Sequence, residues 1–89
     1  MDKFLDEAFG IIKESKYIDH LVYLWGRWQD EKEYEDFEDY KKSASKSLPK
    51  GMDFVRMTKR PFAVTFAYKG ADRHMKLSVT SRKYSLQYV

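Results

Sequence analysis

Cysteine is absent from this chain of 89 residues, and glycine and proline are scarce, with four and two residues. The lack of cysteine excludes disulfide bonds, thiol catalysis and cysteine-ligated zinc. No apolar run reaches the roughly 18 residues that a membrane span needs. The first residues carry acids where a secretory signal would carry bases. We therefore expect a cytoplasmic protein that has no membrane contact.

Aromatic residues are plentiful, at 17% of the chain, and hydrophobic residues make up 43%. So many rings argue against disorder, because they bury a large area even in a small core. The length allows one modest core. We expect a single domain over residues 1–89, with a helical part at 1–48 and a sheet part at 52–89.

Helical spacing of apolar residues dominates the first half of the chain. It predicts a helix over residues 2–13, with Ser15 as a break and second N-cap, and a further stripe to about residue 29. Residues 17–29 leave helix and strand open, because they include strand-favouring side chains and Gly26. Asp30 and Glu33 resemble a capping box and predict a third helix that begins at Asp30 and ends before Pro49. The apolar stripe of that helix is expected at Tyr34, Phe37, Lys41, Ala44 and Leu48.

After Pro49 the apolar residues no longer follow helical spacing and recur instead at every second position. Alternation predicts strands over residues 62–68, 74–80 and 83–88, joined by turns at 69–72 and 81–82, and a less regular strand at Met52–Thr58. Short connections favour an antiparallel meander. The expected fold is α+β, with two or three N-terminal helices packed on one face of a three- to four-stranded sheet.

Charge is divided unevenly along the chain. Residues 1–48 hold eight bases and twelve acids, whereas residues 49–89 hold nine bases and two acids. In a meander, alternate turns lie at one end of the sheet. Lys59 and Arg60 would therefore meet Arg82 and Lys83, with Arg56 nearby and Lys76 on the polar face. Such a cluster suits phosphates or an acidic protein surface, although solvated basic turns are the simpler interpretation.

Two further features could contact a partner. One is an acidic run that contains Glu31, Glu35, Asp36, Glu38 and Asp39. This run could imitate a row of phosphates, but acids at the start of a helix also interact favourably with the helix dipole. In the sequence Trp25-Gly26-Arg27-Trp28, Trp25 fits the core stripe. Trp28 at its margin, together with Arg27, would form a protein contact point.

Residues for catalysis or metal binding do not form a recognisable set. His20 and His74 are the only histidines, and no phosphate-binding glycine loop or nucleophile elbow occurs. The aromatic residues of the strands, such as Phe62, Phe66, Tyr84 and Tyr88, fall on the core face, which disfavours base stacking. We expect neither an enzyme nor a bound cofactor or metal.

The sequence therefore favours a small intracellular protein-binding regulator or inhibitor of a larger protein partner. Virus-encoded proteins that disable bacterial defences or host enzymes offer an analogy of size and composition. The alternative is a nucleic-acid-binding module that uses the basic edge of the sheet. The chain could be a monomer or a homodimer paired through a sheet edge at Met52–Thr58 or 83–89.

Overall fold

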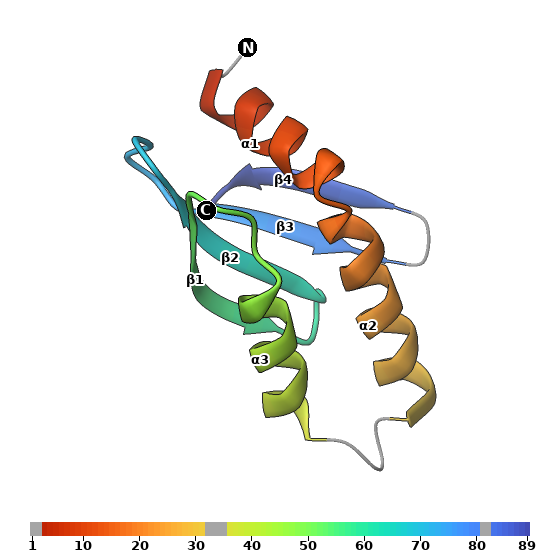
Figure 1. Ribbon diagram of the computed structural model, residues 1–89. Coiled ribbons are helices and arrows are strands. Elements are labelled where there is room, and N and C mark those ends of the chain that lie inside the picture. Colours follow the sequence, from red (N-terminus) through yellow and green to blue (C-terminus); the bar gives the residue numbers. More distant parts are fainter. Residues whose placement is uncertain (1–2, 32–35, 81–82) are drawn as a thin grey trace.

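Three helices precede a four-stranded sheet in the computed structural model, which describes residues 3–31, 36–80 and 83–89. The elements are α1 (Lys3–Glu14), α2 (Tyr17–Glu31), α3 (Phe37–Lys46), β1 (Met52–Thr58), β2 (Ala63–Tyr68), β3 (Met75–Val79) and β4 (Tyr84–Tyr88). Figure 1 shows this order along the chain. The predicted α+β class with N-terminal helices is confirmed.

The junction between α1 and α2 lies at the predicted break. The Ser15 hydroxyl donates to the carbonyl of Ile12 at 2.9 Å and accepts the backbone N–H of Tyr17 at 3.3 Å. Lys16 adopts a positive φ of 63°. These contacts end one helix and start the next, because they replace hydrogen bonds that helix termini cannot make internally.

The ambiguous residues 17–29 belong to a helix, α2. Tyr17, Leu21 and Leu24 are buried at helical spacing, so one face of α2 enters the core. Tyr17 also donates its hydroxyl hydrogen to the carbonyl of Ala44 in α3 at 2.7 Å. Tertiary packing of this face outweighs the local strand preference.

The predicted start of the third helix at Asp30 is wrong. Asp30 lies within α2, and α3 begins at Phe37 after an N-cap at Asp36, whose side chain accepts the N–H of Glu38 at 3.2 Å. The expected core position Lys41 is also wrong, because Tyr40 is buried instead. Residues 32–35, including Tyr34 and Glu33, lie outside the described part of the chain.

The sheet is an antiparallel meander in the order β1-β2-β3-β4. Val64 pairs with Met57 on one side and Leu77 on the other, and Leu77 pairs with Leu86. These side chains face the helices. A bulge between Phe54 and Arg56 shifts the register of β1, which accounts for its irregular pattern.

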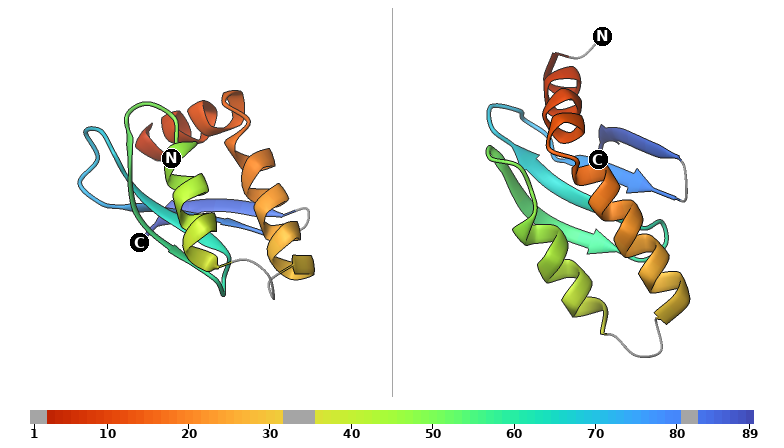
Figure 2. Two further views of the ribbon diagram at one scale, coloured as in Figure 1. Left: turned by 60° about the horizontal axis from the view of Figure 1, so that its bottom comes forward. Right: turned by 45° about the vertical axis from the view of Figure 1, so that its right-hand side comes forward.

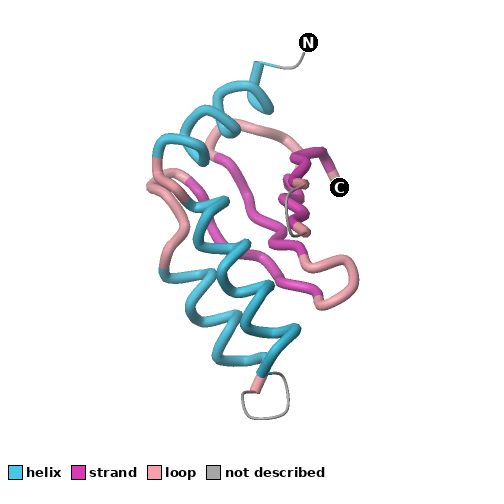
Figure 3. Tube along the Cα trace, turned by 90° about the vertical axis from the view of Figure 1, so that its right-hand side faces the viewer, coloured by secondary structure: helices cyan, strands magenta, loops and turns pink. Residues whose placement is uncertain are grey.

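The three described helices all lie on one face of the sheet, as the left view of Figure 2 shows. Phe66, Met75, Leu77 and Ile12 are fully buried between the two layers. The opposite face carries alternate, mostly polar residues. None of the described helices lies over it (Figure 3). Among the described residues, no helix is long and apolar enough to cross a membrane.

Candidate functional site: a basic end beside an aromatic cluster

The turn between β1 and β2 presents Lys59 and Arg60 to solvent. The Thr58 hydroxyl donates to the carbonyl of Pro61 at 2.7 Å, and the Arg60–Pro61 peptide bond is cis. Thr58, the last residue of β1, pairs with Ala63, the first residue of β2, so the two strands stay paired up to the turn. This hydrogen bond holds a short turn whose two cationic side chains are exposed.

The connection between β3 and β4 lies at the same end of the sheet. Thr80 donates its N–H to the carbonyl of Lys83 at 2.8 Å, and Val79 donates to the carbonyl of Phe62 at 3.0 Å. The second bond ties the end of β3 to the start of β2. Lys83 is exposed, whereas Arg82 and Ser81 lie outside the described residues. We call Lys59, Arg60 and Lys83 the basic end.

Aromatic residues from two helices lie against Lys59, one member of the basic end. The Nζ atom of Lys59 is 5.5 Å from the ring centroid of Trp28 and 5.3 Å from that of Phe37. Trp28 and Phe37 meet edge to face, with centroids 5.2 Å apart. A cation over an aromatic face is attracted by the ring quadrupole. Lys59 is therefore positioned by its neighbours even though it is exposed.

This aromatic cluster is anchored in the core. Tyr40 packs edge to face on Trp28 at 5.5 Å, and Phe62 packs on Phe37 at 6.2 Å. Phe37, Tyr40 and Phe62 are buried, while Trp28 is half-buried. Buried aromatic rings therefore hold the Trp28 indole in place at the margin of the core.

A recess of about 390 Å³ opens at the surface between the helix end and the turn. It is lined by Trp28, Gln29, Lys59 and Arg60. Two cations, an exposed amide and one indole can together bind a carboxylate or phosphate group that projects from a larger surface.

The predicted pairing of Trp28 with Arg27 is not found. Arg27 donates instead to the Tyr23 hydroxyl at 3.3 Å, and its guanidinium lies 5.8 Å from the Tyr23 ring centroid. Successive residues of a helix point in different directions, so Arg27 and Trp28 do not share a face. Trp25 is half-buried and packs against the core.

Arg56 and Lys76 lie apart from the turns, on the uncovered face. Arg56 pairs with Thr65, Thr65 with Lys76, and Lys76 with Gln87, so the four residues form one row across the sheet. Phe62 and Phe66 are buried on the other side. The row offers two cations, and none of its four residues is aromatic.

The acidic run is divided between two helices. Glu31 is the last residue of α2, and Glu35 lies outside the described residues. Asp36 caps α3, Glu38 forms an ion pair with Lys41 at 3.1 Å, and Asp39 is exposed in the first turn. Asp36 and Glu38 thus make local contacts of a helix start.

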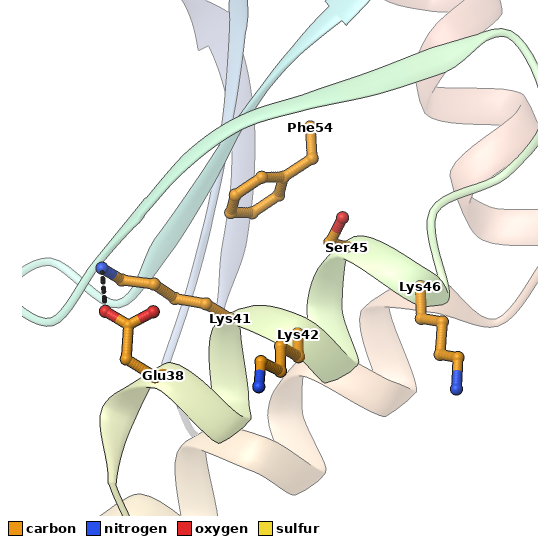
Figure 4. Close-up of a pocket in the computed structure, with 6 residues that line it drawn as sticks. All are labelled: Glu38, Lys41, Lys42, Ser45, Lys46 and Phe54. Atoms are coloured by element: carbon orange, nitrogen blue, oxygen red, sulfur yellow. Dashed lines mark hydrogen bonds and ion pairs between the residues drawn. The ribbon is translucent and has the colours of Figure 1, made fainter.

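A second recess of about 510 Å³ lies between α3 and β1. Its lining residues are Glu38, Lys41, Lys42, Ser45, Lys46 and Phe54. Figure 4 shows Lys41 reaching Glu38, while the ammonium groups of Lys42 and Lys46 point away from Phe54. The cations here do not converge on one point.

The histidines and buried tyrosines have structural contacts. His20 Nε2 is 2.9 Å from the Ser43 hydroxyl, which links α2 to α3. His74 is exposed at the start of β3. Burial raises the pKa of Tyr17. Across residues 3–31, 36–80 and 83–89, no group of three histidine, aspartate or glutamate side chains could hold a metal ion.

The sequence indicated Lys59, Arg60 and Trp28 as candidates, but it gave no signal for Gln29 or for the contact of Phe37 with Lys59. No family model, curated protein or solved structure matches this chain.

Proposed function

We propose that this protein is a small binding protein that regulates or inhibits a larger protein, which it contacts through the basic end. The observation that carries the proposal is the placement of Lys59 over Trp28 and Phe37, with Arg60 lining the same recess. Tryptophan and arginine are the residues that most often dominate protein interfaces.

Charge indicates the kind of surface that this site fits. Residues 49–89 hold nine bases and two acids, and three of these bases form the exposed basic end. An acidic patch on the partner would be steered toward this end and would meet the Trp28 indole beside Lys59 and Arg60. The proposed partner is therefore a protein with exposed aspartate or glutamate side chains around an apolar spot.

The compartment and origin belong to the same proposal. Action inside a cell is supported by the lack of cysteine. The finer proposal, that the protein is virus-encoded and disables a bacterial defence or a host enzyme, rests on its size and composition.

The test compares two variants that change the net charge equally. In Lys59→Glu/Arg60→Glu the basic end is reversed, whereas in Lys50→Glu/Lys69→Glu two exposed lysines near the other end of the sheet are reversed. Tagged protein is used to capture partners from bacterial lysate. We expect a partner that wild type and the Lys50/Lys69 variant retain and that the Lys59/Arg60 variant loses.

Equal retention by both variants would contradict the proposal. Equal loss in both would also contradict it, because the effect would then depend on total charge rather than on the site. Far-UV circular dichroism and thermal unfolding would establish that both variants are folded.

The second candidate function is direct nucleic-acid binding, which the row from Arg56 to Gln87 on the uncovered face favours. This function requires affinity for a single-stranded or duplex oligonucleotide that falls steeply as salt increases. Arg56→Gln/Lys76→Gln should then weaken binding and reduce the salt slope by about two, one for each lost phosphate contact. Binding that is absent at low salt would exclude it.

A further inference from the structure

Strand β4 forms one edge of the sheet. The hydrogen bonds at its two ends determine which of its residues bond to β3. Thr80 donates to Lys83 at 2.8 Å, and Val89 donates to His74 at 3.0 Å. In an antiparallel pair every second residue bonds across the ladder. Ser85 and Gln87 therefore bond to β3, and the backbone N–H and C=O groups of Tyr84 and Leu86 point outward.

No described residue pairs with these outward groups of Tyr84 and Leu86. Edge strands are usually protected by charges, proline or bulges. The β4 sequence Tyr-Ser-Leu-Gln-Tyr contains no charge and no proline, and its pairing with β3 is regular. This edge therefore lacks these three forms of protection.

The other edge is different. β1 has a bulge after Phe54 and exposed charges at Asp53 and Arg56. The comparison selects β4 from the two edges that the sequence offered for pairing.

Apolar surface continues from the β4 edge onto α1. Tyr84 is 44% exposed, and its ring packs on Phe9 with centroids 5.6 Å apart. A recess of about 380 Å³ beside the strand is lined by Leu5, Asp6, Phe9, Tyr84, Ser85 and Leu86. A strand added at this edge would place alternate side chains next to that recess.

Charge differs between the two ends of the strand. Lys13, Lys16 and Asp19 line a recess with Tyr84 at one end, whereas Asp6 lines the recess beside Leu86, and Arg73 lies 4.9 Å from the ring centroid of Tyr88. In an antiparallel pair the ends are exchanged, so the net positive end of one copy lies toward Asp6 of the other. The strand itself carries no charge that would repel its copy.

From this geometry we propose that β4 pairs antiparallel with β4 of a second copy of this chain. The two sheets join into one around a two-fold axis perpendicular to the sheet, with both helical layers on the same side. Tyr84 and Leu86 supply the outward backbone groups, and a residue pair of this kind exchanges two hydrogen bonds. The contact is isologous, as in most dimers.

The test uses two substitutions at one position. Tyr84→Pro removes the outward N–H and leaves the bonds to β3, whereas Tyr84→Thr removes the ring but keeps the N–H. Sedimentation equilibrium up to about 1 mM protein should give twice the 10.7 kDa chain mass for wild type and for Tyr84→Thr. Tyr84→Pro should raise the dimer Kd about tenfold or more.

A wild-type protein that stays monomeric throughout this range would overturn the proposal. So would a folded Tyr84→Pro variant that dimerises as well as wild type. Hydrogen exchange of wild type provides a test that needs no variant. We expect the amides of Tyr84 and Leu86 to gain protection as concentration increases, and protection that is independent of concentration, or gained only in β1, would contradict the proposal.

Discussion

Lys59 connects the charge of the basic end to the packing of the core. Its ammonium group lies within 5.5 Å of the ring centroids of Trp28 and Phe37, which come from different helices. Lys50, also exposed, has no aromatic ring described beside it. The difference between these two lysines is open to measurement.

We expect Lys59→Ala to lower the free energy of unfolding by about 0.5–1 kcal/mol, since exposed cation–π contacts have this value. Lys50→Ala should have an effect near zero. Urea unfolding followed by tryptophan fluorescence would measure both. Equal effects would show that the rings do not hold Lys59.

Tyr17 makes the stability of the protein sensitive to alkali. Burial raises the pKa of its hydroxyl, so a tyrosine in the unfolded chain, with a pKa of about 10, loses its proton first. The stability contributed by the neutral phenol is fully present below pH ~10 and is lost as pH increases through the folded-state pKa.

Tyr17→Phe should lower stability at pH 7 by about 1 kcal/mol, through loss of the hydrogen bond to Ala44, and should flatten the decline above pH 10. Urea unfolding at several pH values would show this. A decline as steep as that of wild type would mean that another group governs the alkaline limit. Tyr23→Phe, at an exposed position, serves as the control.

At the scale of the element, α3 shows why a run of acids need not be an interaction surface. Asp36 accepts the N–H of Glu38, and Glu38 pairs with Lys41. Both contacts serve the helix itself. The start of α3 is thus explained without any partner.

Asp36→Ala should destabilise the protein by about 1 kcal/mol, the usual value of an N-cap. Asp36→Asn should be nearly neutral, because asparagine caps as well as aspartate. Thermal unfolding would compare them. If both variants lose the same stability, the charge of Asp36 matters more than its hydrogen bond.

The order of the elements, and the type of each except residues 17–29, could be predicted because the apolar period changes near Pro49. The position of helix ends could not, because Asp30 and Asp36 both resemble caps in a region with seven acids between residues 30 and 39. Only tertiary contacts decided between them, since Tyr40 rather than Lys41 meets Trp28. The bulge after Phe54 could not be predicted, because it contains no proline or glycine.

At the scale of the whole molecule, topology brings residues of the candidate site together from distant parts of the chain. The meander places the turn of Lys59 and Arg60 at the same end as Lys83, a feature that follows from strand order alone. The approach of Trp28 and Phe37 depends on how the helices cross the sheet. The spacing of apolar residues along the sequence does not reveal how the helices cross the sheet.

The proposed dimer gives the molecule two basic ends. Because the two-fold axis passes through the β4 edge, each copy presents its Lys59 and Arg60 toward an opposite end of the extended sheet. A partner with two acidic patches would then bind with added avidity. The dimer and the partner site remain separable, because Tyr84→Pro changes the first and Lys59→Glu/Arg60→Glu the second.

The central claim is that the basic end and Trp28 form one binding surface for acidic groups, and nuclear magnetic resonance tests it without a known partner. Isotope-labelled protein is titrated with a hexaglutamate peptide. The account predicts that the amides of Lys59, Arg60 and Lys83 and the indole N–H of Trp28 shift together, while the indole of Trp25 and the amide of Lys69 stay in place. Shifts that centre on Lys50 and Lys69, or that spread evenly over the exposed lysines, would contradict it.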